Sequence, residues 1–125
     1  MSRKKILLVD DSGTTLMMEK MILGKGDYEL FTATNGEEAI EKAVAERPDL
    51  ILLDVVMPKM NGFEACERIR EIDDLKETPV IMVTTRGEAE NVQQGFELGC
   101  TDYVTKPINS LELITKVRNC LDEKA

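Results

Sequence analysis

Residues 49–54 read Asp-Leu-Ile-Leu-Leu-Asp, and this stretch decides the fold. Four consecutive apolar residues suit a strand that is buried on both faces, as strands of parallel sheets are. The run ends at Asp54, so a carboxylate stands where the strand would leave the core. The stretch therefore predicts a central strand, and it directs attention to the polar residues that end the other apolar runs.

Short apolar runs alternate with helical periodicity along the whole chain. The predicted strands are Lys5–Val9, Tyr28–Ala33, Asp49–Asp54, Pro79–Thr84 and Asp102–Thr105. The predicted helices run from the cap Ser12 to about Lys25, over Glu37–Glu46, Phe63–Ile72 and about Glu88–Leu98, and through Leu111, Ile114, Val117 and Leu121. Strand–helix alternation with short connections implies parallel strands with helices on both faces. We expect an α/β, flavodoxin-like doubly wound fold with five parallel strands in the order 2-1-3-4-5 and five helices.

The composition favours one domain and excludes several kinds of chemistry. The chain has 125 residues, of which 42% are apolar, so we expect a single domain over residues 1–125. It carries 16 Lys+Arg against 24 Asp+Glu, a net charge of −8, which argues against nucleic acid or a membrane surface as a direct partner. Because the chain has no histidine, Ser-His-Asp catalysis, His-ligated zinc and a phosphohistidine carrier are excluded.

The cysteines and the apolar runs indicate the compartment. Cys66, Cys100 and Cys120 show no Cys-x-x-Cys spacing, so reduced thiols are expected rather than zinc or disulfides. The apolar runs are far shorter than the roughly 20 residues of a membrane helix, and no signal peptide is evident. We expect a soluble cytoplasmic protein.

Three methionines, Met17, Met18 and Met21, lie in the first predicted helix. Thioether side chains adapt to varied surfaces, so these residues would suit a partner groove. Core packing is the more common role of such residues, and we expect at least two of the three to be buried.

Polar side chains follow the ends of the predicted strands, where a doubly wound sheet places its functional site. These residues are Asp10, Asp11, Asp54, Thr84 and Lys106. Each has an ordinary explanation alone, such as a helix cap or a solvated charge, but five at one edge favour a site. Three nearby carboxylates repel one another unless a cation lies among them, and their oxygens suit Mg²⁺.

This set of side chains predicts phosphoryl chemistry. A carboxylate such as Asp54 can attack phosphorus and form an acyl phosphate. Mg²⁺ on Asp10 and Asp11 would neutralise the repulsion between carboxylate and phosphoryl group, and Lys106 and Thr84 would contact phosphoryl oxygens. No residue in these loops can act as a base toward water, so slow turnover is expected, which suits a switch better than an enzyme.

Four segments carry a family resemblance: ILLVDDS at 6–12, PDLILLDVVMPKMNG at 48–62, PVIMVTT at 79–85 and GCTDYVTKP at 99–107. With these segments in this order, the chain resembles the receiver domains of two-component response regulators, the single-domain chemotaxis type included. The resemblance covers essentially the whole chain. It implies that Asp54 is the phosphoacceptor and that Asp10 and Asp11 bind Mg²⁺, with the backbone carbonyl of Val56 as a further metal ligand.

The resemblance also implies a phosphate-contacting lysine, Lys106, joined to Pro107 by a cis peptide bond. Thr84 and Tyr103 would form the switch: Thr84 moves toward the phosphoryl group, and Tyr103 turns inward. This would remodel a face made by the fourth helix, fifth strand and fifth helix, which would bind a downstream protein. The phosphoryl donor would be a phosphohistidine on a sensor kinase or phosphotransfer protein. No organic cofactor is implied, and we expect a monomer.

Three alternatives stay open at this point. A phosphohydrolase of the haloacid dehalogenase type needs a second aspartate two residues after the nucleophile, where this chain has Val56. A carrier of flavin mononucleotide needs a phosphate-binding loop after the first strand, where Asp10 and Asp11 would repel phosphate. The third alternative is a receiver excised from a multidomain transcriptional regulator. The chain stops soon after its last predicted helix, which favours a stand-alone regulator.

Overall fold

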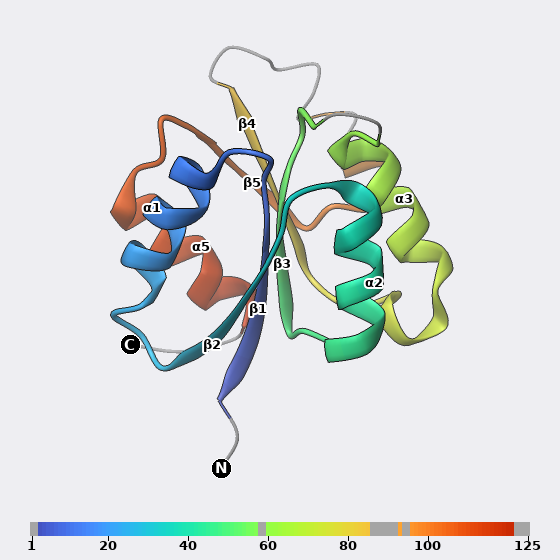
Figure 1. Ribbon diagram of the computed structural model, residues 1–125, viewed down its shortest axis with the longest axis horizontal. Coiled ribbons are helices and arrows are strands. Elements are labelled where there is room, and N and C mark those ends of the chain that lie inside the picture. The colour runs from blue at the N-terminus through green and yellow to red at the C-terminus, as the bar shows by residue number, and fades with distance from the viewer. Residues whose placement is uncertain (1–2, 58–59, 86–92, 94–95, 122–125) are drawn as a thin grey trace.

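The computed structural model describes residues 3–57, 60–85, 93 and 96–121. Five parallel strands form one sheet in the order β2-β1-β3-β4-β5, with helices on both faces (Figure 1). The strands are β1 (Lys4–Val9), β2 (Tyr28–Ala33), β3 (Leu50–Asp54), β4 (Val80–Thr85) and β5 (Asp102–Lys106). This confirms the predicted α/β doubly wound fold and its strand order.

The helices cover the sheet in two pairs, as Figure 1 shows: α1 (Gly13–Leu23) and α5 (Ser110–Cys120) on one face, α2 (Gly36–Glu46) and α3 (Gly62–Glu71) on the other. A short 3₁₀ helix, η1 (Asp73–Leu75), follows α3. The helix predicted over Glu88–Leu98 lies mostly outside the described residues. Of that stretch, Gln93, Phe96 and Glu97 are described and are helical. Among the described residues, no helix has the length and apolar character needed to cross a membrane.

Side-chain caps fix where the helices begin. Ser12, Asn35, Asn61 and Asn109 each accept a hydrogen bond from the backbone N–H three residues later. At α3 the cap is reciprocal, because the Glu64 carboxylate also accepts from the backbone N–H of Asn61. Helix α2 ends before Arg47, whose φ of 49° breaks the helical path ahead of a proline, as the sequence predicts.

The alternation of β3 explains its unbroken apolar run. Leu50 and Leu52 pack into the cluster under α1 and α5, whereas Ile51 and Leu53 pack into the cluster under α2 and α3. Successive side chains of a strand point to opposite faces, so a strand covered on both sides needs apolar residues at every position. The run continues to Asp54, which is still almost fully buried at 4% exposure.

One prediction about the core is wrong. Met17, Met18 and Met21 are 63%, 40% and 68% exposed, so none of the three is buried. The buried stripe of α1 consists instead of Leu16, Glu19 and Leu23. These positions recur at spacings of three and four, and their contact with the sheet turns the methionines outward.

Candidate functional site

The sheet topology brings the predicted site residues to one edge. Asp10 follows β1, Asp54 ends β3, and these two strands are neighbours in the sheet. Parallel strands point the same way, so their carboxyl ends meet at the same edge. One carboxylate oxygen each from Asp10, Asp11 and Asp54 lies within 4.8 Å of the others. The structure thus confirms the clustering of these three carboxylates that the strand ends predicted.

Lys106 bridges two of these carboxylates from the end of β5. Its Nζ lies 3.3 Å from Asp54 Oδ1, to which it donates a hydrogen bond, and 3.3 Å from Asp10 Oδ2. Burial lowers the pKa of Lys106, but the carboxylates of Asp54 and Asp10 outweigh it and hold the pKa above its usual value. The lysine is therefore a fixed positive charge between them. Its peptide bond to Pro107 is cis, as the resemblance implied.

Asp10 is fully buried and held in one orientation by its own loop. Its Oδ1 accepts a hydrogen bond of 2.9 Å from the backbone N–H of Ser12, the residue that caps α1. Its Oδ2 has no aligned hydrogen-bond donor, although Lys106 lies near it. A buried carboxylate oxygen without a donor is costly, so this atom is suited to a bound cation.

Asp54 has a raised pKa of about 6, against an ordinary value of 3.8. Burial is the largest cause, and the negative charge of Asp10 adds to it. Lys106 and a hydrogen bond from the backbone N–H of Val56 act in the opposite direction. Asp54 is therefore mainly ionised at neutral pH, yet it is held in surroundings that disfavour its charge.

The donor set fits a hard divalent cation. Asp10, Asp11 and Asp54 contribute three carboxylates, while Lys106 is the cation paired with Asp10 and Asp54 among the described residues. Asp11 is exposed, so the cluster opens to solvent on one side. Carboxylate oxygens with access to water are the ligands that Mg²⁺ prefers in proteins.

The two remaining predicted residues stand on the neighbouring strands. Thr84 lies in β4, one position after the residue that pairs with Asp54 in the register, and is 3% exposed. Tyr103 lies in β5, where it packs against the cluster under α2 and α3. Its ring meets Phe96 edge-on at 6.2 Å, and Lys116 Nζ lies 4.4 Å from its centroid. Thr84 and Tyr103 are thus near the acidic cluster but outside it.

Two residues were not singled out by the sequence: Gly62, which contacts the site, and Glu19, which is buried in α1. A Cβ at Gly62 would lie 2.2 Å from the carbonyl oxygen of Asp54, so only glycine allows the first turn of α3 to cover the end of β3. The Asn-Gly pair at 61–62 marks a turn, but its contact with Asp54 needed the structure. Glu19, a carboxyl on the buried stripe of α1, also escaped prediction because a lone glutamate in a helix usually faces solvent.

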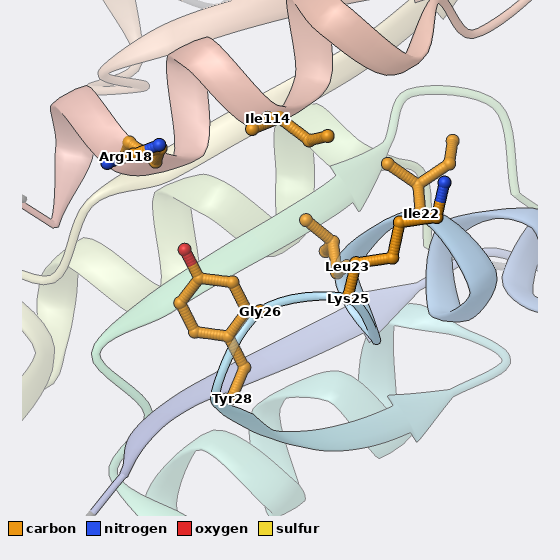
Figure 2. A pocket seen from close by; sticks show the side chains of 7 residues that line it. All are labelled: Ile22, Leu23, Lys25, Gly26, Tyr28, Ile114 and Arg118. Carbon is orange, nitrogen blue, oxygen red and sulfur yellow. The ribbon is translucent and has the colours of Figure 1, made fainter. Parts of the chain in front are cut away.

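A separate cavity of about 300 Å³ lies between α1 and α5 (Figure 2). Ile22, Tyr28, Ile114 and Arg118 are among the residues that line it. Tyr28 pairs with Lys4 at the start of β1, so the cavity lies at the amino ends of the strands. It is therefore distinct from the acidic cluster, which stands at their carboxyl ends.

Comparisons with known proteins agree with this geometry. The sequence-family model of the response regulator receiver domain matches residues 6–118 of this chain. The transcriptional regulatory protein ResD of Bacillus subtilis is 44% identical over 117 residues, which are 94% of this chain and 48% of ResD. The alkaline phosphatase synthesis transcriptional regulatory protein PhoP of the same organism is 40% identical over 118 residues, which are 94% of this chain and 48% of PhoP. The chain spans about half the length of these curated relatives.

Solved structures match over nearly their full length. A putative response regulator from Chloroflexus aurantiacus superposes with a TM-score of 0.94 at 34% identity, covering 98% of this chain and 100% of that one. The chemotaxis response regulator CheY4 of Vibrio cholerae superposes with a TM-score of 0.89 at 37% identity, covering 95% and 99%. From its matched motifs, its sheet and its relatives, the chain belongs to the family of response regulator receiver domains.

Proposed function

We propose that the chain is a phosphorylation-dependent signalling switch whose phosphoacceptor is Asp54. Receiver domains of response regulators are phosphoacceptor switches that take phosphoryl groups from histidine kinases. The observation that carries the assignment to Asp54 is its position: it shares a cluster with Asp10 and Asp11, and its Oδ1 lies 3.3 Å from Lys106 Nζ. A nucleophile, a cation site and a fixed positive charge therefore meet at one residue.

The transfer step follows from these groups. An ionised oxygen of Asp54 attacks the phosphorus of a phosphohistidine on a sensor kinase or phosphotransfer protein. The new O–P bond forms as the P–N bond breaks, and the donor imidazole keeps the electron pair of that bond. Lys106 can exchange its ion pair with the carboxylates for one with a phosphoryl oxygen. The Thr84 hydroxyl can donate a hydrogen bond to another phosphoryl oxygen.

Receiver domains bind Mg²⁺ at an acidic pocket, and we assign the corresponding ligands here to Asp10, Asp11 and Asp54 with the backbone carbonyl of Val56. Bound there, Mg²⁺ would neutralise charge between the attacking carboxylate and the phosphoryl group. The Oδ2 of Asp10, which has the ion pair with Lys106 but no aligned hydrogen-bond donor, and the exposed Asp11 support this assignment. The chain itself supplies the orientation, since the Ser12 N–H fixes Asp10 and Lys106 spans the two buried carboxylates.

We propose that the chain is not an enzyme, beyond slow phosphorylation and dephosphorylation of itself. A phosphohydrolase of the haloacid dehalogenase type would place an acid/base where Val56 stands, and that side chain is apolar and 66% exposed. The chain has no histidine that could replace this group. The acyl phosphate therefore persists long enough to change a binding surface.

We assign the switch to Thr84 and Tyr103, which the alternation of their strands places on the same face of the sheet. Tyr103 pairs with Met82, and Thr84 stands two residues after Met82 in β4. The two switch residues are therefore offset by two residues along adjacent strands and lie on the same face. Movement of Thr84 toward a phosphoryl group would open space beside the Tyr103 ring. The output surface is then the predicted fourth helix with β5 and α5, and its partner is a downstream protein.

We further propose that residues 1–125 form one receiver domain that is monomeric before activation and binds no nucleic acid itself. The acidic net charge of −8 supports the latter point. The free cysteines Cys66, Cys100 and Cys120 support the cytoplasm, where thiols stay reduced. A second candidate is the receiver part of a transcriptional regulator, favoured by the names and lengths of ResD and PhoP.

The test is uptake of phosphoryl groups from acetyl phosphate, followed by intact-protein mass spectrometry. We expect wild type to gain one phosphoryl group in the presence of Mg²⁺ and to lose this gain when EDTA removes the metal. The substitution Asp54→Asn should abolish the gain, because an amide is not a nucleophile toward phosphorus. Asp73→Asn, at an exposed aspartate of η1, is the matched control and should behave as wild type. Equal uptake by Asp54→Asn would reject the assignment.

A further inference from the structure

Glu19 is the least expected residue of the core. It is 0% exposed, and neither of its carboxyl oxygens has a hydrogen-bond partner in the described part of the chain. It stands between Leu16 and Leu23 on the buried stripe of α1, where an apolar side chain would pack without loss. Burying a carboxyl without partners is unfavourable, and the unfavourable part is its charge. The folded protein therefore favours the neutral, protonated form of Glu19.

The surroundings of Glu19 connect it to the acidic cluster. The pKa of Glu19 is raised from 4.5 to about 8, mainly by burial; the negative charges of Asp10 and Asp54 contribute to the rise, while Lys106 acts against them. Asp10 Oδ2 is, like the two Glu19 oxygens, buried without a hydrogen-bond donor. Glu19 is not a member of the group of carboxylates that could share one cation. It is therefore a buried carboxyl outside that group, whereas Asp11 of the group is exposed.

The described charged groups that act on Glu19 all belong to the site. They stand after β1, at the end of β3 and at the end of β5, as Asp10, Asp54 and Lys106. Helix α5 also packs beside α1, but its Arg118 lines the cavity at the amino ends of the strands, together with Lys25 (Figure 2). The other cation of α5, Lys116, is engaged by the carbonyl oxygen of Tyr103 and the carboxylate of Glu112.

Electrostatic coupling between two sites is reciprocal. If the charges of Asp10 and Asp54 favour a proton on Glu19, a cation that neutralises those charges must favour its loss. An ionised Glu19 in turn adds a negative charge that acts on the cluster and strengthens cation binding by the same factor. Proton and cation therefore compete, although they occupy different residues.

We propose that Glu19 is a charge-compensating residue of the magnesium site: it is neutral when the site is empty and ionised when Mg²⁺ is bound, so that metal binding releases a proton. This inference rests on the proposed function, since it takes the acidic cluster as the metal site. In the step, the O–H bond of Glu19 breaks, the proton passes to solvent water or buffer, and the carboxylate keeps the electron pair. Glu19 acts through Asp10 and Asp54, so it is a positioning residue and not a metal ligand.

The experiment is calorimetric titration of the metal-free protein with MgCl₂ at pH 7.5, in PIPES, HEPES and Tris. The dependence of the observed heat on the ionisation enthalpy of the buffer gives the number of protons released. We expect wild type to release more than about 0.2 and at most about 0.8 proton per Mg²⁺, because a group with a pKa of about 8 is mostly protonated at this pH and can lose no more than that fraction. Asp54, with a pKa of about 6, is already ionised and adds little.

Two substitutions separate Glu19 from the rest of the site. Glu19→Gln keeps the shape of the neutral acid but cannot ionise, and Glu19→Leu gives a second folded variant if the amide is poorly tolerated. Both should release less than about 0.2 proton per Mg²⁺. The dissociation constant of wild type should fall at least about threefold from pH 7 to pH 9, and this tightening should disappear in both variants. Glu41→Gln, at an exposed position of α2, should match wild type in both measurements.

The outcomes distinguish the two proposals. Wild-type proton release by both Glu19→Gln and Glu19→Leu would overturn the role of Glu19 and leave the metal site intact. Mg²⁺ binding that survives Asp11→Asn and Asp54→Asn unchanged would instead overturn the proposed metal site itself.

Discussion

The two faces of the sheet differ in where they hold charge. Under α2 and α3 the buried cluster is made of apolar residues and the cysteines Cys66 and Cys100. On the opposite face, α1 buries Glu19 next to leucines, and the alternation of β1 and β3 continues from Leu8 to Asp10 and from Leu52 to Asp54. The buried charges of the site therefore lie on the α1 and α5 face, while the described core of the α2 and α3 face is apolar and has the proposed switch residue Tyr103 packed against it.

The two core layers, one under α2 and α3 and one under α1 and α5, therefore contribute differently to stability and to the site. The α2 and α3 face supplies stability through apolar burial, and it carries Tyr103 at its margin. On the α1 and α5 face, buried carboxyl groups lower the stability of the fold. This is common where a functional site needs charged groups that packing alone would exclude. Truncating an apolar side chain under α2 and α3 should therefore lower the free energy of unfolding, whereas replacing a buried carboxyl on the α1 and α5 face should raise it.

The largest effect is expected at Ile69, a fully buried residue of α3. Ile69→Ala removes packed methyl groups and leaves a cavity, so it should lower the free energy of unfolding by about 2–5 kcal/mol. Urea unfolding followed by circular dichroism measures this. A loss below about 1 kcal/mol would show that the α2 and α3 face is not the packed layer described above.

On the opposite face, Glu19→Leu should stabilise the metal-free protein. The pKa of Glu19 is higher in the folded state than its ordinary value of 4.5, so folding binds a proton between pH 4.5 and about 8. This contribution is complete below pH 4.5 and is lost as the pH rises through about 8. Wild type should therefore lose stability over this range, and at pH 8.5 Glu19→Leu should exceed it by about 2–4 kcal/mol. A stability difference that does not change from pH 5 to pH 8.5 would contradict this.

A smaller gain is expected from Asp54→Asn. The pKa of Asp54 is raised from 3.8 to about 6, so its stabilising protonation is lost as the pH rises through 6. At pH 7.5 the asparagine variant should be more stable by about 1–3 kcal/mol in the absence of metal. Thermal unfolding with EDTA tests this. Saturating Mg²⁺ should stabilise wild type more than the variant, which narrows or reverses the difference.

The smallest effect concerns a cap on the α2 and α3 face. Asn61 accepts a hydrogen bond of 3.0 Å from the backbone N–H of Glu64 and begins α3. Asn61→Ala should lower the free energy of unfolding by about 1 kcal/mol, whereas Asn61→Asp should retain most of the stability because aspartate also caps. If both variants were equally destabilised, the loss would have a cause other than the cap.

Most of the fold and the acidic cluster could be predicted from the sequence. Runs such as Leu50–Asp54 mark buried strands by composition alone, and the register of parallel strands then brings their ends together. Five of the ten strand bounds differ from the predicted ones, each by one residue, because the first and last residues of a strand carry little of the pattern.

Other features depend on how the helices sit against the sheet. The sequence could not show which side of α1 faces inward, since leucines and methionines offer apolar residues on more than one side of the helix. In the structure Leu16 and Leu23 face the sheet. This orientation of α1 about its axis exposes Met17 and Met21 and buries Glu19. The close approach of Gly62 to Asp54 is likewise a contact between residues whose distance only the folded chain defines.

The central claim is that Asp54, at the end of the charged layer, receives the phosphoryl group. Its most direct test is to treat the protein with acetyl phosphate and Mg²⁺, trap the acyl phosphate by borohydride reduction, and locate the modified residue by peptide mass spectrometry. We expect reduction at residue 54 in wild type and none in Asp54→Asn. Modification that maps to Asp10 or Asp11 instead, or that persists in Asp54→Asn, would contradict it.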